Sequence, residues 1–238
     1  MKKCLDGLKE FQRVIVLDSK SKDKTRIIIS KFKNVKYIST QLNDYVSKLN
    51  KLISLSKTKW VLLIDADYEI HKNFKTFLTT KKLLNSISGY SFPIFNVIRN
   101  KIIWENIYPS KILLFNKNRV FFKRDGHKEK MIISGKIRKL NYFFLHNDRK
   151  DDKRWMETQI KWATFDAKKI INSKFSDLSL IDKLRLIPFC SIFASFFYFF
   201  FLKKIFIYGS AGFFYLKQRL IYEITINYII FKFLFQKL

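Results

Sequence analysis

Two short apolar runs that each end in a carboxylate constrain the fold of this chain most strongly. Arg13–Asp18 reads RVIVLD and Trp60–Asp65 reads WVLLID, and runs of this kind are typical of buried parallel strands. Between them the pattern predicts a helix capped by Asp23, a strand at Val35–Ile38 and a helix at Asp44–Leu55. Strands that alternate with helices at this spacing predict an open α/β sheet.

The pattern changes after the second apolar run. A helix is expected at Asn73–Leu84. Short β runs follow it, at Tyr90–Ile98, Lys111–Phe115, Val120–Lys123, Met131–Ile133 and Tyr142–Leu145. Ser134-Gly135 is expected to form a hairpin turn, and Asp151–Ile171 has the spacing of a long amphipathic helix.

The charge of the chain favours an anionic partner. It carries 47 Lys and Arg against 19 Asp and Glu, which gives a formal charge of +28. The basic residues are mostly scattered lysines, whereas contacts with nucleic acid favour arginine. We therefore expect a membrane surface, and no nucleic acid, as the anionic partner. Cys4 and Cys190 match no zinc or redox spacing and exclude a disulfide scaffold.

The C-terminal part of the chain is apolar and aromatic, because half of the 26 phenylalanines lie after Arg185. Leu186–Leu202 is 17 residues without a charge. That is shorter than the about 20 apolar residues that a spanning helix needs. Ile205–Leu216 and Leu220–Phe235 are further apolar runs. We expect helices that lie in the membrane interface or form a shallow hairpin, and the alternative is a buried helical core.

Carboxylates follow both predicted strands. Asp18 ends the first strand, and Asp65 and Asp67 lie at the end of the second. In an open α/β sheet, ligands bind beyond the carboxyl ends of the strands. Two carboxylates at i and i+2 can hold a divalent cation together with a diphosphate, and the metal then offsets charge on the departing phosphate. The alternative is that these are solvated loop acids in a basic protein.

Several segments resemble the motifs of family 2 glycosyltransferases. Val14–Thr25 resembles the nucleotide-binding stretch VVDSGSTDGT, and Trp60–Glu69 resembles WVLxLDADE. Ile107–Phe115 is similar to GWYPDRKLRLF, Asp125–Glu129 is similar to xxVHEK, and His146 follows an apolar strand.

Two further segments are similar to one branch of this family, which adds sugars to lipopolysaccharide cores. Lys48–Asn50 falls where that branch has QKN, and Tyr198–Phe213 is similar to YxLKxGFLDGxxGF. The resemblance implies a GT-A fold and transfer of a sugar from a nucleotide donor with inversion. The family begins with a further strand and an Asn-Glu motif. Only 13 residues precede Val14 here, so we expect the sheet to lack its first strand.

The resemblance also implies roles for individual residues. Asp18 would contact the base of the nucleotide, and Asp65 would face the ribose. Asp67, together with Asp65, would hold a divalent metal, Mg²⁺ or Mn²⁺. The other expected donor-binding residues are Ser19, Asp23 and Asn50. Inversion needs a general base near the acceptor hydroxyl, and this assignment stays open between Glu129, His127 and Asp125.

The expected organisation is a GT-A-like domain at residues 1–150, a helical connector at 151–185 and a membrane-associated tail at 186–238. Met1–Asp6 lacks the apolar run of a signal peptide. We expect a transferase at the cytoplasmic face of the inner (plasma) membrane, peripheral or shallowly inserted. Its partners would be a nucleotide-sugar donor and a lipid-linked or lipopolysaccharide acceptor. The alternative is a truncated, catalytically inactive homologue that keeps the fold and the membrane contact.

Overall fold

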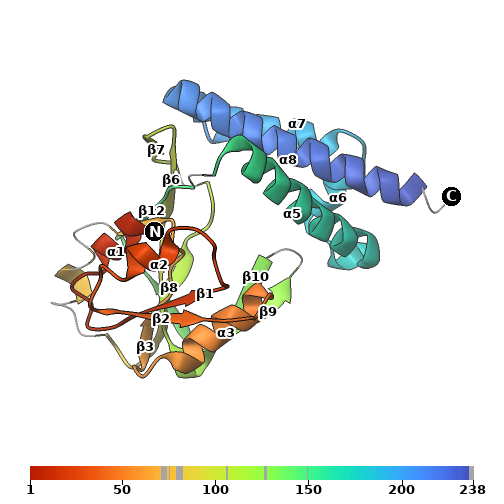
Figure 1. Ribbon diagram of the computed structural model, residues 1–238. Helices are drawn as coiled ribbons and strands as arrows, with labels where there is room; N and C mark the ends of the chain where they lie inside the picture. The colour runs from red at the N-terminus through yellow and green to blue at the C-terminus, as the bar shows by residue number, and fades with distance from the viewer. Residues whose placement is uncertain are drawn as a thin grey trace. The chain divides into compact units, whose positions relative to one another are not determined.

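In the computed structural model the chain divides into two compact units, whose elements Figure 1 labels. Unit 1 contains Met1–Val97, Asn106–Arg124 and Glu129–Asn147, and unit 2 contains Ile98–Glu105, Asp125–Lys128 and Asp148–Leu238. The structure describes residues 1–70, 74, 76–78, 83–105, 107–125, 128–148 and 150–235. Half of the predicted helix Asn73–Leu84 lies outside the described residues, and so does His127.

Unit 1 begins with the parallel strand pair that the first apolar run predicts. β1 (Val14–Asp18) pairs with β2 (Val35–Ser39), with Asp18 opposite Ser39. α1 (Lys2–Gly7) and α2 (Thr25–Ile29) pack against this pair. Their shared cluster is apolar and includes Cys4, Leu5, Leu8, Ile29, Phe32, Val14, Val16 and Val35. The predicted parallel strand is therefore confirmed, and its carboxyl end carries Asp18 out of the cluster.

The helix α3 (Tyr45–Leu55) confirms the prediction from its apolar spacing. Asp44 is its N-cap, and the Asp44 carboxylate accepts a hydrogen bond from the Ser47 amide at 2.7 Å. Leu49 and Ile53, four positions apart, lie on the buried side of the helix. They contact a cluster that contains Phe115, Val120 and Phe122.

The second apolar run enters a different sheet from the first. In the order β11-β5-β8-β3, that sheet contains Lys136–Lys139, Ile87–Phe92, Lys111–Asn116 and Trp60–Leu62. β3 is shorter than the predicted strand and runs antiparallel to β8, with Trp60 opposite Asn116. In the described part of the chain, β1 and β2 form a sheet of their own. The predicted α/β class is confirmed, but the described strands form several small sheets in place of one open sheet, because local alternation does not specify which strands pair.

A third sheet has the order β4-β12-β6-β7, formed by Tyr68–Ile70, Phe144–His146, Ile94–Ile98 and Lys101–Ile103. β12 runs antiparallel to β4, and this places His146 opposite Tyr68. An aromatic cluster packs on these strands, with Phe74, Phe92 and Phe144 fully buried. The register therefore brings His146 to the segment that follows β3.

The predicted hairpin at Ser134-Gly135 is wrong. β9 (Val120–Asp125), which follows the short helix η1 (Lys117–Arg119), pairs with β10 (Lys128–Ile133). β11, after the turn, pairs instead with β5. Gly135 has φ +99°, and a Cβ there would lie 2.3 Å from the Ser88 hydroxyl. Glycine at this position permits the chain that enters β11 to pass close to Ser88 of β5, and it does not close a hairpin.

Unit 2 is helical apart from the segments near β7. Its helices are α5 (Asp152–Asn172), η2 (Phe175–Asp177), α6 (Leu180–Arg185), α7 (Cys190–Phe197), the π-helix η3 (Tyr198–Leu202), η4 (Ile205–Tyr208) and α8 (Ser210–Phe235). The predicted long amphipathic helix is confirmed in α5. It packs against α8 through Ala163, Ala167 and Ile170 on one side and Tyr222, Ile226 and Ile230 on the other. Among the described residues, no helix combines the length and the apolar character that crossing a membrane requires.

A buried ion pair joins α6 to α8 inside unit 2. The Arg185 guanidinium donates to both carboxylate oxygens of Glu223, at 2.9 and 2.7 Å. The two residues are 8% and 2% exposed. Burial opposes the charge of Arg185, but Glu223 outweighs it and raises the pKa of the guanidinium. Glu223, which interrupts an apolar run in the sequence, is thus matched by a partner 38 positions earlier.

This pair predicts a pattern of stabilities. Arg185→Met leaves the buried Glu223 carboxylate without its partner, and we expect the free energy of unfolding to fall by about 3–5 kcal/mol. Glu223→Leu should cost less, because Arg185 keeps its ion pair with Asp182, 3.0 Å away. The double variant removes both charges and should recover most of that loss. Urea denaturation measures all three variants.

The exposed pair Lys9–Asp6, 2.8 Å apart, supplies the control, because Lys9→Met should leave the unfolding midpoint unchanged. If the double variant loses as much free energy of unfolding as the two single variants together, the two charges do not stabilise each other.

Candidate active site

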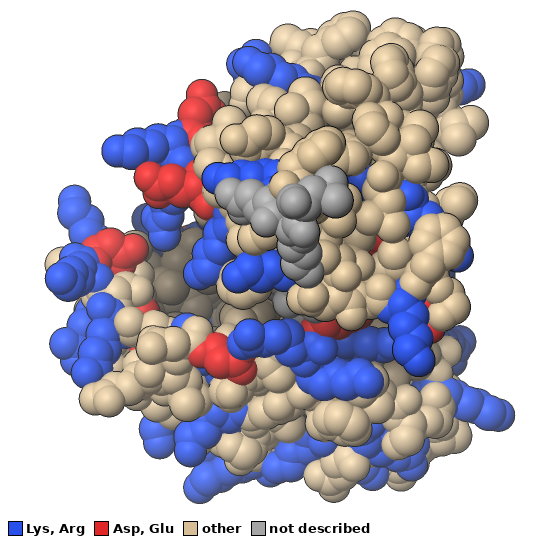
Figure 2. Space-filling view, turned by 90° about the vertical axis from the view of Figure 1, so that its right-hand side faces the viewer, with Lys and Arg blue, Asp and Glu red and all other residues tan. Residues whose placement is uncertain are grey.

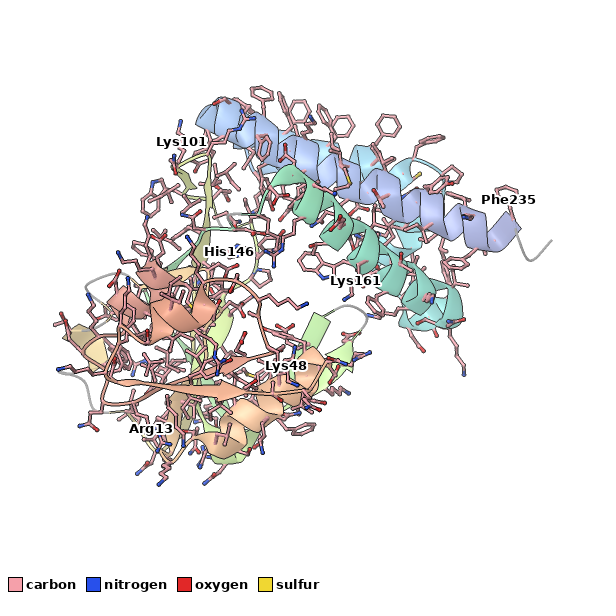
Figure 3. The ribbon with its side chains drawn as sticks, in the orientation of Figure 1. Arg13, Lys48, Lys101, His146, Lys161 and Phe235 are labelled. Carbon is pink, nitrogen blue, oxygen red and sulfur yellow. The ribbon has the colours of Figure 1, made fainter. Side chains whose placement is uncertain are left out.

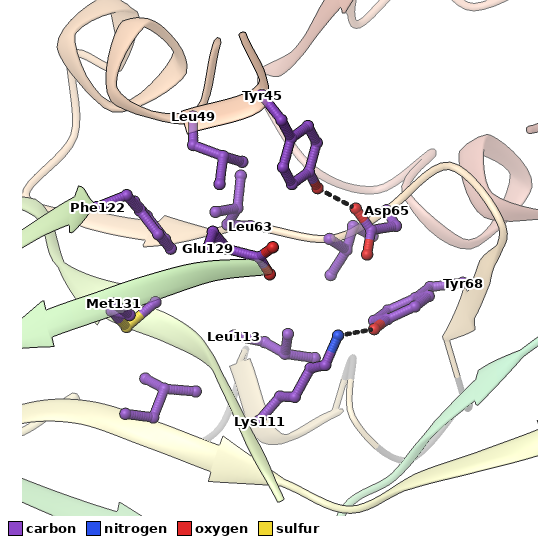
Figure 4. A pocket seen from close by; sticks show the side chains of 12 residues that line it. Tyr45, Leu49, Leu63, Asp65, Tyr68, Lys111, Leu113, Phe122, Glu129 and Met131 are labelled. Atoms are coloured by element: carbon purple, nitrogen blue, oxygen red, sulfur yellow. Dashed lines mark hydrogen bonds between the residues drawn. The ribbon is translucent and has the colours of Figure 1, made fainter. Parts of the chain in front are cut away.

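A pocket in unit 1 collects polar groups from elements far apart in the sequence. Its volume is about 210 Å³, and Figure 4 shows the side chains around it. The lining residues are Tyr45, Leu49, Leu63, Ile64, Asp65, Tyr68, Lys111, Ile112, Leu113, Phe122, Glu129 and Met131. They come from α3, the segment after β3, β4, β8, β9 and β10. One wall is therefore apolar, and the polar groups gather at the other end.

Asp65 is held at the polar end of the pocket by Tyr45. The Tyr45 hydroxyl donates to the Asp65 carboxylate at 2.7 Å (Figure 4). Tyr45 is 47% exposed as a whole, but its hydroxyl end is enclosed. This enclosure and the negative charge of Asp65 raise the pKa of the phenol, so Tyr45 stays a hydrogen-bond donor at neutral pH. The geometry fixes one carboxylate oxygen of Asp65 and leaves the other for a ligand.

Lys111 brings a positive charge to the same pocket. Its ammonium donates to the Tyr68 hydroxyl at 3.1 Å (Figure 4). Enclosure opposes the charge of Lys111, but the Tyr68 oxygen and the carboxylates of Asp65 and Glu129 outweigh it and raise the pKa of the ammonium. Tyr68 is 3% exposed, and burial raises its pKa to about 12. The pocket thus holds a permanent cation beside two carboxylates.

Of the three candidate bases, Glu129 lines this pocket. Its side chain points from β10 into the space between the Tyr45–Asp65 pair and Lys111 (Figure 4). Asp125 instead forms an ion pair with Lys169 of α5, 2.6 Å away, in unit 2. His127 lies outside the described residues. The structure therefore brings Glu129, and not Asp125, together with Asp65.

Asp67 lies beside a different partner from Asp65. Its carboxylate is 3.2 Å from Nε2 of His146, and Nδ1 of His146 is 3.0 Å from the side-chain oxygen of Asn96. Which ring nitrogen donates depends on the tautomer of His146: a proton on Nε2 makes it a donor to Asp67, whereas a proton on Nδ1, toward Asn96, leaves the lone pair of Nε2 for a cation beside the Asp67 carboxylate. An imidazole nitrogen and a carboxylate oxygen in this arrangement form a donor pair for a divalent cation. No group of three such residues that could hold a metal occurs in the described ranges.

Asp18 orders the loop that follows β1. Its carboxylate accepts from the Ser21 amide at 3.0 Å, from the Ser21 hydroxyl at 2.5 Å and from the Tyr37 hydroxyl at 2.9 Å. Burial opposes its charge, but these bonds, together with one from the Ser19 amide, lower the pKa of the carboxyl. Asp23 accepts from the Thr25 amide at 2.9 Å and so supports the start of α2. This set of candidate donor-binding residues lies on one loop.

Asn50 has a different contact from the one expected. Its side-chain amide donates to the Phe122 carbonyl at 3.0 Å and accepts from the Phe122 amide at 2.9 Å. Both bonds join α3 to β9 across 72 positions. Asn50 therefore positions the helix that carries Tyr45 and Leu49, and these two residues line the pocket.

Three pocket residues were not predicted from the sequence. Each lies next to a predicted feature, but its hydrogen-bond partner is distant in the sequence. Tyr45 bonds to Asp65, 20 positions away, and Lys111 bonds to Tyr68, 43 positions away. Tyr45 follows the cap residue Asp44, and Lys111 begins β8. The available signal for Lys111 was its place in Ile107–Phe115, the segment that is similar to GWYPDRKLRLF.

Comparisons with known proteins extend these observations. The sequence model of Glycosyl transferase family 2 matches residues 1–144. None of the curated proteins compared with the chain matches it. Among solved structures, a crystal structure of TarS residues 1–349 from S. aureus is 15% identical with a TM-score of 0.37, over 96% of this chain and 78% of that one. A second TarS crystal structure is 16% identical with a TM-score of 0.38, over 87% of this chain and 43% of that one. We draw nothing further from structural likenesses this distant.

The Asn50 contacts predict a defect in the pocket wall. Asn50→Ala removes both bonds to Phe122, which is 6% exposed, and leaves a buried amide and carbonyl without partners. We expect the free energy of unfolding to fall by about 1–3 kcal/mol. Asn50→Asp keeps the acceptor and should lose less. Chemical denaturation measures both variants.

Asn118→Ala is the matched control, because Asn118 is exposed and its side chain should contribute little. If Asn50→Ala and Asn118→Ala are equally stable, the link between α3 and β9 does not depend on Asn50.

Proposed function

Because the chain belongs to glycosyl transferase family 2, we propose that it moves a sugar from a nucleotide-sugar donor to an acceptor hydroxyl with inversion. The observation that carries this proposal is the polar end of the pocket, where Asp65, Glu129 and Lys111 face one space (Figure 4). A carboxylate base, a carboxylate for the donor and a cation are the groups that such a transfer uses. The acceptor that we propose is lipid-linked or of the lipopolysaccharide-core type.

The donor lies along the ends of β1 and β3 in this proposal. Asp18 contacts the nucleobase, and Ser19 and Asp23 line the same loop. Asp65 faces the ribose with the carboxylate oxygen that Tyr45 does not occupy. The support for this placement is that Asp18 and Asp65 both follow strands, and that each is oriented by a tyrosine hydroxyl, from Tyr37 and Tyr45 respectively.

A divalent metal, Mg²⁺ or Mn²⁺, fits beside the Asp67 carboxylate better than between Asp65 and Asp67. Asp65 is bonded to Tyr45, whereas the Asp67 carboxylate faces the Nε2 atom of His146. Magnesium is often bound through one or two carboxylates, and substrate phosphates and water complete its shell, so the Asp67 carboxylate would be one such ligand and His146 would add a nitrogen donor. When bound, the metal supplies positive charge that stabilises the departing diphosphate.

Glu129 is the general base in this proposal. It accepts the proton of the acceptor hydroxyl, and the hydroxyl oxygen forms a bond to the anomeric carbon. The bond from that carbon to the nucleoside diphosphate breaks on the opposite face, and the diphosphate leaves with the electron pair. Lys111 supplies one positive charge in the pocket while this negative charge develops.

This assignment predicts different effects for two acids. Glu129→Gln keeps the size of the side chain but removes the base, so kcat should fall by about 10²–10⁴-fold while the donor Kd stays unchanged. Asp125→Asn, the control, should keep kcat, because Asp125 pairs with Lys169. Transfer assays across nucleotide sugars, with membranes as the acceptor source, measure kcat.

A near-normal kcat in Glu129→Gln with a large loss in Asp125→Asn would move the base to Asp125. If the wild-type chain transfers no sugar from any donor, the inactive homologue is the better description.

Membrane contact is the second part of the proposal, and it rests on unit 2. Six rings of α7, η3, η4 and α8 contact one another in a continuous series, and we call them the aromatic face: Phe196, Phe197, Phe200, Phe201, Phe206 and Phe213. Phe197, Phe201 and Phe213 are each more than half exposed, at 56%, 52% and 53%. Ring side chains project from the side of these helices that faces away from α5 (Figure 3).

The charges around the aromatic face support a bilayer as its partner. The upper part of the surface in Figure 2, where α7 and α8 lie, carries few charged side chains. Lys204 follows η3, and Lys217 lies one turn of α8 after Phe213. Apolar rings with lysines beside them fit the interface of an anionic membrane. We propose that this face holds the enzyme at the cytoplasmic side of the inner membrane, peripherally or shallowly inserted.

The aromatic face predicts membrane binding that salt does not reverse. Burying a phenylalanine contributes roughly 1.5–3 kcal/mol, so Phe197→Ser/Phe201→Ser should weaken binding to neutral phosphatidylcholine vesicles at least about tenfold. Wild-type binding should persist in 1 M NaCl, which screens exposed charge. Vesicle co-sedimentation measures both effects.

Ile27→Ser/Ile160→Ser is the control, because these residues are 61% and 47% exposed but lie outside the aromatic face. Release of the wild-type protein by 1 M NaCl would mean that the attachment is electrostatic.

A further inference from the structure

A second cavity lies entirely within unit 2, apart from the pocket in unit 1. Its volume is about 380 Å³, and it is lined by Arg99, Asp152, Ser210, Phe213, Phe214 and Lys217. Nothing in the proposed transfer uses these residues. Four of them come from α8 and lie at the spacing i, i+3, i+4 and i+7, which places them on one face of that helix.

Arg99 reaches this cavity from the turn between β6 and β7. Arg99 and Asn100 both have positive φ, at 47° and 62°, as a tight two-residue hairpin turn requires. The Arg99 guanidinium lies over the ring of Phe214, 4.3 Å from its centroid. A planar guanidinium on an aromatic ring keeps its outward N–H groups oriented for a ligand. Arg99 is thus exposed but held in one orientation.

The cavity favours an anion. Arg99 and Lys217 supply two positive charges, and Asp152 supplies one negative charge. A guanidinium and an ammonium that face one space suit a phosphate group, which the guanidinium can bind through two parallel hydrogen bonds.

The cavity is continuous with the aromatic face. Phe213 lines the cavity and is also a member of that face, through a ring contact with Phe200 at 6.4 Å. Phe200 in turn contacts Phe206 at 5.0 Å. A ligand with a phosphate in the cavity would therefore have apolar rings directly beside it. That combination matches a lipid, with its phosphate between Arg99 and Lys217 and its acyl chains along the rings.

We infer that this cavity, which we call the headgroup site, binds the phosphate of an anionic membrane lipid. The inference rests on the proposed membrane contact of the aromatic face and adds a lipid-selective site to it. The aromatic face contributes affinity for any bilayer, whereas the headgroup site contributes preference for anionic lipid.

The test compares two double variants of the full chain that lose the same charge. Arg99→Gln/Lys217→Gln changes the headgroup site, and Lys161→Gln/Lys168→Gln removes two exposed lysines of α5. The probes are vesicles of phosphatidylcholine alone and vesicles of phosphatidylcholine with phosphatidylglycerol. We expect the headgroup-site variant to lose about tenfold more affinity than the α5 variant for the anionic vesicles. Both variants should bind the neutral vesicles like the wild-type protein, because the choline cation of phosphatidylcholine offsets the charge of its phosphate and is repelled by Arg99 and Lys217.

If the two double variants lose the same affinity for anionic vesicles, the headgroup site is overturned. Unchanged binding of both variants to neutral vesicles would still support the membrane contact of the aromatic face. Absence of wild-type binding to both vesicles would overturn the inference together with the membrane contact. Release from anionic vesicles by about 1 mM inorganic phosphate would mean that the site takes free phosphate, which also contradicts the inference. If Arg99→Gln prevents folding, Lys217→Gln alone is compared with Lys161→Gln in the same assay.

Discussion

The double hydrogen bond between Asn50 and the backbone of Phe122 is the contact on which the pocket depends. It fixes α3 against β9, and α3 carries the tyrosine that orients Asp65. The apolar contacts of Leu49 and Ile53 in the same helix have no direction of their own. The side-chain amide of Asn50 fixes the position of α3 relative to β9, because it donates to the carbonyl of Phe122 and accepts from the amide of the same residue. The position of the pocket wall therefore follows from one side chain that is not itself part of the lining.

Charged side chains in this protein either have separate polar partners or form ion pairs with each other. Asp65 and Asp67 lie two residues apart, but one is bonded to Tyr45 and the other faces His146, so each can serve a different part of a donor. In unit 2, Arg185 and Glu223 neutralise each other in a buried environment. Many other lysines and arginines of the described residues are exposed, where scattered charges raise the potential of the surface without defining a site. Arg99 and Lys217 differ from that background because they share a cavity with aromatic rings.

Local patterns predicted the elements well, and long-range pairing limited the rest. α3 and α5 have clear caps at Asp44 and Asp151 and regular apolar spacing, so their bounds were nearly correct. The turn expected at Ser134-Gly135 contains a glycine with positive φ, but a turn signal does not say which strands it joins, and the predicted hairpin was wrong. Asp65 and Glu129 were predictable from motifs. Tyr45 and Lys111 were not, because their roles arise only when distant segments meet.

Hydrogen exchange of the full chain, with and without each member of a panel of nucleoside diphosphates and Mg²⁺, tests the central claim most directly. The claim is that the donor binds at the ends of β1 and β3, beside the pocket that contains Glu129. We expect slower exchange of backbone amides in residues 18–25 and 63–69 with at least one nucleotide, and unchanged exchange in α5 and α8. Slower exchange confined to unit 2, or no change in residues 18–25 and 63–69 with any nucleotide, would contradict it.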